Sequence, residues 1–143
     1  MFIGEFSHKI DAKGRLAIPV KFRAALKEGA VVTRGLDSCL FIYTKKEWQI
    51  LATKLAALPL SRADARAFAR LMLAGAMDVD IDKQGRILIP DYLRTYGTLS
   101  KEVTVAGLFN RVEIWNTENW EKYKNKTERA TNTITEHLGE LEI

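Results

Sequence analysis

The sequence contains one thirteen-residue stretch twice, as residues 11–23 (DAKGRLAIPVKFR) and residues 82–94 (DKQGRILIPDYLR). At an offset of 71 residues the two copies share an aspartate, a glycine, two arginines, an isoleucine and a proline. The match continues at an offset of 72, where Val31, Gly35, Leu36, Ile42 and Trp48 meet Val103, Gly107, Leu108, Ile114 and Trp120. A unit of about 45 residues has therefore been duplicated, and because each copy is short for an independent core, we expect the two copies to share one.

The length and composition describe a small globular protein. With 143 residues, 47% of them hydrophobic and 28% charged, the chain fits one domain or two small halves packed together. The N-terminus, MFIGEFSH, is not a secretory leader, and no stretch approaches the roughly 20 apolar residues that span a bilayer. We therefore expect a cytoplasmic protein without a membrane partner. A single cysteine, Cys39, and two histidines predict neither a disulfide framework nor a metal site, and no cofactor is expected.

Charge is distributed unevenly along the chain. Residues 1–36 carry seven Lys or Arg and three acids, whereas the tail has four glutamates, Glu128, Glu136, Glu140 and Glu142, against Arg129. A basic first part permits an anionic partner such as nucleic acid, although a solvated surface has the same composition.

Each repeat has the pattern of a β-β-α-β-β unit. Weak alternation over residues 5–10 and a short apolar run at residues 15–18 predict two strands joined by the Asp-Ala-Lys-Gly turn. Pro19, at the expected first helical position, starts a short helix with Phe22, Ala25 and Leu26 on its apolar face. The later strands fall at residues 31–33 and 40–43, and their counterparts in the second unit at residues 102–106 and 111–115.

The remaining segments read as helices. A capping box at residues 44–47 predicts a helix to about Leu58, and Pro59 ends it. The next helix opens at residues 61–64, with Ala65, Phe68, Ala69 and Met72 inward and a stripe of Arg62, Arg66 and Arg70 outward, which favours a solvated face. The closing helix starts near Asn116, and its Thr-rich end, residues 126–135, is expected to fray or to dock on a neighbour. The predicted division is residues 1–50 and 76–121 for the two halves, 51–75 for the connecting helices and 122–143 for the tail.

Catalysis by the repeated loop is disfavoured by the residues available. A nucleophilic site needs Cys39 or a serine beside a histidine with an orienting group, yet His8 and His137 lie in segments without such partners. Neither histidine recurs in the other repeat, so we expect no catalytic residues and no small-molecule substrate.

A binding function explains the residues of the loop better than catalysis does, but these residues are consistent with two interpretations. Lys13 and Arg15 beside Gly14 can approach phosphates or the O6 and N7 acceptors of guanine, with Asp11 orienting Arg15 or pinning the turn. The other reading is a hairpin closed by a salt bridge, with its lysine in solvent.

The paired Asp-x-x-Gly-Arg loops, together with VTRGL at residues 32–36 and VAGLFNRVEIW at residues 105–115, resemble the MraZ family over nearly the whole chain. The resemblance implies an α+β fold in which two tandem swapped-hairpin halves, of the type named after SpoVT and AbrB, share one small barrel-like core with flanking helices. It also implies a transcriptional regulator, expected to repress the division and cell-wall gene cluster. Such a protein binds short direct repeats in promoter DNA as a ring-like homo-oligomer associated with the nucleoid.

Carried over to this chain, the resemblance makes Asp11, Gly14, Asp82 and Gly85 the residues that structure the two turns. The expected DNA-binding residues are Lys9, Lys13, Arg15, Lys83 and Arg86. Gln84 replaces the lysine of the first loop in the second, which leaves the base contacts of the second loop open. The alternative function is an AbrB-type antitoxin or protein-binding module, although the tail is short and lacks repeated apolar anchors.

Overall fold

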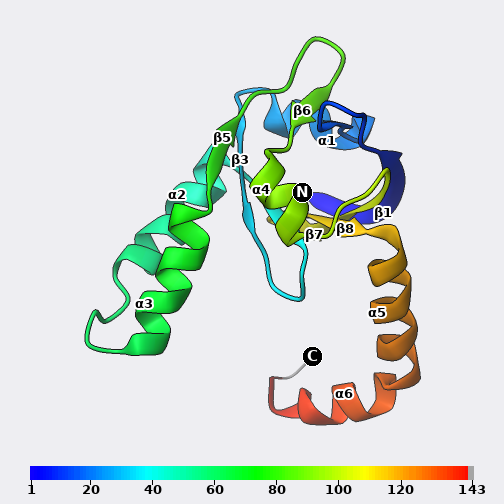
Figure 1. Cartoon of the computed structure of the whole chain (residues 1–143). Helices are drawn as coiled ribbons and strands as arrows, with labels where there is room; N and C mark the ends of the chain where they lie inside the picture. The colour runs from blue at the N-terminus through cyan, green and yellow to red at the C-terminus, as the bar shows by residue number, and fades with distance from the viewer. Residues whose placement is uncertain (142–143) are drawn as a thin grey trace.

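A computed structural model of the chain describes residues 1–141 and confirms the two β-β-α-β-β units (Figure 1). The first unit consists of β1 (Phe2–Lys9), β2 (Arg15–Ala17), α1 (Val20–Leu26), β3 (Ala30–Arg34) and β4 (Leu40–Thr44). The second consists of β5 (Met77–Val79), β6 (Arg86–Leu88), α4 (Asp91–Tyr96), β7 (Glu102–Phe109) and β8 (Val112–Asn116). Between the units lie α2 (Lys45–Ala56), α3 (Ala63–Ala69) and the π-helical turn η1 (Arg70–Ala74); after them come α5 (Thr117–Arg129), α6 (Thr131–His137) and the 3₁₀ turn η2 (Gly139–Leu141).

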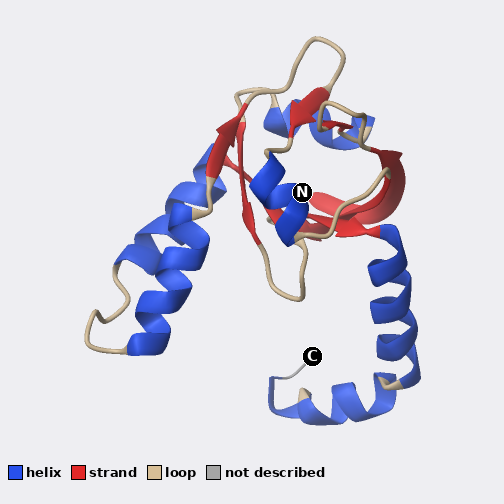
Figure 2. Ribbon diagram, in the orientation of Figure 1, coloured by secondary structure: helices blue, strands red, loops and turns tan. Residues whose placement is uncertain are grey.

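The two units exchange strands, which makes the fold a mixed α+β structure with interleaved halves. The main sheet has the order β1-β7-β8-β4-β3-β5, and every neighbouring pair is antiparallel. Strand β1 of the first unit pairs with β7 of the second over eight positions, and β5 of the second unit pairs with β3 of the first. Strand β4 of the first unit also pairs with β8 of the second, and β2 and β6 form a separate ribbon. Figure 2 shows the strands at the centre of the molecule, with α4 among them and with α2–α3 and α5–α6 extending outward.

The two units share one hydrophobic core, as the duplication predicts. Matched residues of the repeats are buried together: Leu16 and Ile18 of the first unit lie in the same cluster as Ile87 and Ile89 of the second. Each of these four side chains is almost completely inaccessible to solvent, so truncating one to alanine removes several methylene groups from a packed core. Such a change typically costs about 2–5 kcal/mol of stability. A unit on its own would lack all the core side chains that the other unit contributes, so neither unit is expected to fold alone.

A second, smaller hydrophobic cluster attaches the arm formed by α2, α3 and η1. Leu55 and Met72 of the arm pack with Phe41, Tyr43 and Trp115 of the sheet. The predicted capping residue is present, since Thr44 Oγ1 accepts a hydrogen bond from the backbone N–H of Glu47 at 3.1 Å. The tip of the arm extends away from the core (Figure 1).

Several local expectations were wrong. Pro19 precedes α1 as its N-cap and is not its first helical residue, and Ala25 is exposed. The N-cap of α3 is Arg62, and Phe68 is 36% exposed because the tip of the arm lies beyond the sheet that would cover it. Helix α2 ends at Ala56, two residues before Leu58.

The Thr-rich end of the chain is helical, where poor helix formers predicted fraying. The hydroxyl groups of Thr131 and Thr135 donate to backbone carbonyl groups one turn earlier, which satisfies part of the helical backbone locally. Glu142 of the acidic tail lies outside the described residues. Over residues 1–141, no helix combines the length and the apolarity needed to traverse a membrane. The predicted boundaries at residues 50, 75 and 121 stay a prediction.

Candidate nucleic-acid interface

The first repeated loop is a turn closed by the carboxylate of Asp11. Oδ1 of Asp11 accepts hydrogen bonds from the backbone N–H groups of Lys13, at 3.0 Å, and Arg15, at 2.9 Å. Oδ2 accepts from Nε of Arg15 at 2.7 Å. One aspartate therefore fixes both the backbone of the turn and the side chain of the arginine, as the sequence predicted for the turn.

The second loop reproduces this arrangement atom for atom. Oδ1 of Asp82 accepts from the backbone N–H groups of Gln84, at 2.8 Å, and Arg86, at 2.9 Å, and Oδ2 accepts from Nε of Arg86 at 3.0 Å. The change from Lys13 to Gln84 leaves the turn unaltered because only the backbone of that residue takes part. The two loops therefore differ in what they display and not in how they are built.

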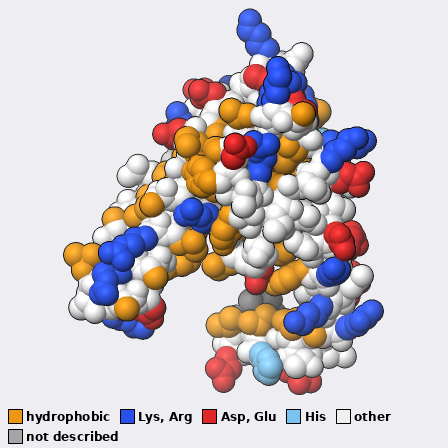
Figure 3. All heavy atoms as spheres, in the orientation of Figure 1, with side chains coloured by type: hydrophobic (Ala, Val, Ile, Leu, Met, Phe, Trp, Pro, Cys, Tyr) orange, Lys and Arg blue, Asp and Glu red, His pale blue; other side chains and the backbone are white. Residues whose placement is uncertain are grey.

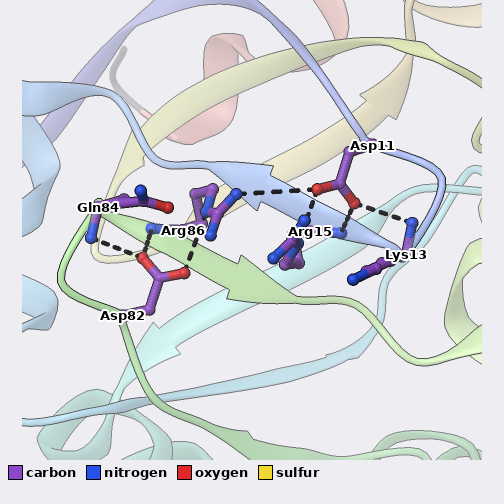
Figure 4. Close-up of polar contacts among 6 residues, drawn as sticks. All are labelled: Asp11, Lys13, Arg15, Asp82, Gln84 and Arg86. Atoms are coloured by element: carbon purple, nitrogen blue, oxygen red, sulfur yellow. Dashed lines mark hydrogen bonds and ion pairs between the residues drawn. The ribbon is translucent and has the colours of Figure 1, made fainter.

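The antiparallel β2–β6 ribbon carries the two loops at its opposite ends, with the side chains of Arg15 and Arg86 between them (Figure 4). At its ends Ile18 donates its backbone N–H to the carbonyl of Gly85 at 2.9 Å, and Ile89 donates to the carbonyl of Gly14 at 2.8 Å. Nη1 of Arg86 lies 3.9 Å from Oδ2 of Asp11, so the loops also contact each other through their side chains. Each chain thus carries one composite head made of both loops, which we call the paired-loop head (residues 11–15 and 82–86).

Two arginines that the sequence analysis did not assign to the site hold this head together. Arg23 of α1 packs over Gly85 of the opposite loop, and Arg94 of α4 packs over Gly14. Nε of Arg23 donates to the carbonyl of Ile18 at 2.8 Å. Nε of Arg94 is buried and has no hydrogen-bond partner among the described residues, while its guanidinium pairs with Asp91. The signal was available, since both arginines belong to the repeated stretch.

Gly14→Ala is expected to destabilise the protein by more than the roughly 1–2 kcal/mol that a left-handed backbone costs a residue with a side chain. Gly14 has a φ of +86°, and a Cβ there would lie 2.9 Å from the carbonyl oxygen of Ile89 and 2.8 Å from Cζ of Arg94. Urea unfolding measures the loss. Gly139→Ala is the matched control, because a Cβ there meets nothing within 4 Å, and equal unfolding midpoints for the two variants would contradict the prediction.

The two aspartates should also make stability depend on pH in acid. The hydrogen bond from the backbone N–H of Arg15 lowers the pKa of Asp11 below 3.8, and that from Arg86 does the same to the pKa of Asp82. A lowered pKa in the folded state means that the stabilisation is present above the ordinary value and is lost as the pH falls through the lowered one.

We therefore expect the double variant Asp11→Asn and Asp82→Asn to melt below the parent at pH 7. The difference should shrink as the pH falls below the ordinary carboxyl pKa and through the lowered pKa values that Asp11 and Asp82 have in the folded protein. Calorimetric melting between pH 2.5 and pH 7 tests this expectation. A difference that stays constant across the range would mean that the carboxylate charge contributes nothing.

The side chains of the lysines predicted for the site take no part in the hydrogen bonds that close the two turns. Lys9 ends β1 two residues before Asp11, and Lys13 and Lys83 lie within the loops; all three are exposed. Lys and Arg side chains stand at the end of the molecule that carries the β5–β6 loop (Figure 3). Such mobile cations suit contact with phosphates, whereas the fixed arginines suit recognition of a defined acceptor pair.

The other reactive groups are poorly placed for catalysis. Burial raises the pKa of the Cys39 thiol, which keeps it protonated and weakly nucleophilic. Burial lowers the pKa of His8, which lies on β1 near Arg23. Within residues 1–141, no group of three or more His, Cys, Asp or Glu side chains is arranged to hold a metal ion.

The sequence of this chain is similar to a known protein family and to individual members of it. The family model for the MraZ protein, whose description includes the term antitoxin-like, matches residues 1–71 and again residues 72–139. Over 143 residues, which cover both chains completely, this chain is 52% identical to a transcriptional regulator MraZ of Thermoanaerobacter pseudethanolicus. It is 50% identical to one of Ligilactobacillus salivarius and 47% identical to one of Natranaerobius thermophilus, again with complete coverage of both chains.

Proposed function

This chain belongs to the MraZ family of transcriptional regulators, whose role is not enzymatic, and we propose that it binds promoter DNA through the paired-loop head. The observation that carries the proposal is the fixed placement of two arginines, Arg15 and Arg86, in loops of identical construction at the two ends of one ribbon. A protein that reads DNA needs such donors in a set position, because a bidentate contact to guanine O6 and N7 tolerates little displacement.

The two arginines read bases through their terminal nitrogens. Their Nε atoms are taken by Asp11 and Asp82, and the Nη atoms can turn to guanine, with Nη1 of Arg86 giving up its 3.9 Å ion pair with Asp11. The aspartates act by orienting the arginines and not by touching DNA, because a carboxylate is repelled by phosphate. Lys9, Lys13 and Lys83 contribute phosphate contacts that position the head on the duplex.

The two loops present different side chains at one matched position, which makes the head asymmetric. Lys13 in the first loop is a cation, whereas Gln84 in the second can form a bidentate contact with adenine N6 and N7. A single chain therefore has a preferred orientation on DNA, although the backbone hydrogen bonds of its two loops are the same. This asymmetry suits a site that is itself not a palindrome.

The biological setting follows from the family resemblance. Copies of the chain assemble into a ring-like homo-oligomer, and the ring binds short direct repeats upstream of the division and cell-wall gene cluster, which it represses while associated with the nucleoid in the cytoplasm. Rotation about one axis relates the subunits of a ring, so their heads face DNA in the same sense. That relation matches direct repeats.

The proposal is tested by measuring binding to promoter DNA at several salt concentrations. The binding constant should fall steeply with salt, with a slope of roughly −0.9 per phosphate contacted, and a scrambled duplex should bind more weakly than promoter DNA at every salt concentration. Fluorescence anisotropy gives the binding curves and light scattering gives the size of the complex. Equal binding of the two duplexes would refute sequence-specific recognition.

An antitoxin-type function, in which the protein holds a protein partner, is the second candidate. The description of the family includes the term antitoxin-like, and the C-terminal segment exposes apolar side chains at helical spacing: Ile134 of α6, Leu138 directly after it and Leu141 of η2. This corrects the expectation that the tail lacks repeated apolar anchors. Recovery of a stoichiometric second protein with the full chain from its native host, which dissociates when promoter DNA binds, would favour this candidate.

A further inference from the structure

The C-terminal helix α6 lacks the contacts that would stabilise it within its own chain. Every side chain from Thr131 to Leu141 is exposed, and the main contacts of α6 are with its neighbours α5 and η2. An isolated helix shorter than about 12–15 residues is marginal in water, and α6 has seven residues, three of them threonine. Packing against another surface would supply the missing stability.

The apolar side chains of this segment lie where a partner can cover them. Ile134, Leu138 and Leu141 are between 37% and 64% exposed and recur at helical spacing. Hydrophobic side chains gather along the edge of α6 that faces the core, and open space separates this edge from the α2–α3 arm (Figure 3). Helix α5 holds α6 in this position, because Trp120 and Lys124 of α5 bond to Glu5 of β1. We call residues 131–141 the acidic foot.

The tip of the α2–α3 arm is the complementary surface. Its Leu60 is 83% exposed, the highest value for a large hydrophobic side chain in the described chain, and Phe68 of α3 is also exposed. Nη1 of Arg66 donates a hydrogen bond to the carbonyl of Leu60 at 2.8 Å, and Arg62, two residues after Leu60, forms an exposed ion pair with Asp64. Exposed hydrophobic side chains with arginines next to them are typical of a protein-binding surface, whereas a surface that faces only solvent is usually polar.

The charges of the two surfaces are opposite. Residues 45–74 of the arm contain six Lys or Arg and two acids, a net charge of +4. The acidic foot contains Glu136 and Glu140 and no Lys or Arg, a net charge of −2 with His137 neutral. Complementary charge around an apolar centre favours a specific contact and orients the two partners.

We propose that the arm tip of one copy packs on the acidic foot of a second copy. In one chain the α2–α3 arm and α5–α6 project from the core as separate extensions with open space between them (Figure 1). Because they are different surfaces, the contact between two copies is heterologous, and it generates a closed ring when the rotation closes. This inference specifies the interface of the homo-oligomer in the proposed function. It also gives Arg62 and Arg66 a role in the contact between copies, whereas the sequence pattern alone favoured a solvated face for them.

A charge exchange tests the pairing. The arm variant Arg62→Glu with Arg66→Glu and the foot variant Glu136→Lys with Glu140→Lys should each weaken self-association by roughly tenfold or more, measured by sedimentation velocity without DNA. Mixing the two variants should restore assembly into mixed oligomers, because each supplies the surface that the other lacks. Unchanged assembly of both single-surface variants, or no recovery on mixing, would overturn the inference.

A second pair of variants tests the apolar contact. Leu60→Ser should dissociate the oligomer, whereas Val20→Ser, which changes a 75% exposed side chain on α1, should leave it intact. Both side chains are too exposed to support the fold, and melting of the monomer fraction verifies this. Equal assembly of the two variants would contradict the inference.

Failure of this interface can be told apart from failure of DNA recognition. Binding of a duplex with a single repeat reports on the paired-loop head alone, and it should be the same for parent and Leu60→Ser. Loss of assembly with retained single-repeat binding supports the interface. A parent protein that sediments as a monomer at micromolar concentration would overturn the interface while leaving the head testable.

Discussion

The double variant Arg15→Ala and Arg86→Ala is expected to lose specific binding to promoter DNA and to keep its fold. A bidentate contact to guanine is worth roughly 1–3 kcal/mol of discrimination, so removal of both arginines should reduce the affinity for one repeat by about two orders of magnitude or more. Both side chains are partly exposed at the surface of the head, and exposed ion pairs contribute little to stability. Anisotropy titration with a single-repeat duplex and thermal melting measure the two effects.

The variant Arg15→Lys with Arg86→Lys is the matched control. It keeps the positive charge and removes the planar fork, so it should bind promoter and scrambled DNA with similar, weak affinity and an unchanged dependence on salt. This result separates base reading from attraction to phosphate. A folded double-alanine variant that binds the promoter as tightly as the parent would show that the loops are not the reading head.

The local structure of the site could be predicted from the sequence because it depends on residues close together in the chain. Asp11 and Arg15 are four residues apart, and an aspartate at the start of a glycine-containing turn has few ways to satisfy its carboxylate other than the nearby backbone N–H groups. The same argument applied to Asp82 and Arg86. Because the sequence is duplicated, each strand and helix was predicted from two copies of its pattern. Both units have the predicted order of elements, β-β-α-β-β.

The relation between the two units could not be predicted from these local patterns. The pairing of β1 with β7 joins segments about a hundred residues apart, and alternation within a strand does not specify its partner. The packing of Arg23 over Gly85 depends on that pairing, so the repeat alignment marked the arginine without giving its role. The exposure of Phe68 has the same origin, because helical periodicity indicates an apolar face but not whether a second surface in the same chain covers it.

The placement of both loops on one ribbon changes how the operator is expected to be read. Because the β2–β6 ribbon joins the loops into one head, each chain reads one repeat, and successive repeats are read by successive copies of the chain. A single head has few contacts and should bind weakly. Affinity for the whole operator then comes from several heads that bind at once, and such linkage can raise it by about 10²–10⁴.

Insertion of about five base pairs between two direct repeats is therefore expected to cost far more affinity than insertion of about ten. Half a helical turn places the second repeat on the opposite face of the duplex, where a head that points in the same sense as its neighbour cannot reach it. A full turn keeps both repeats on one face, and bending of the DNA or a skipped subunit can accommodate the longer distance. Gel-shift titration of the two spacing variants against a single-repeat duplex measures the effect: the half-turn variant should bind no better than the single repeat. Equal affinities for the two spacings would mean that each chain binds DNA independently of its neighbours.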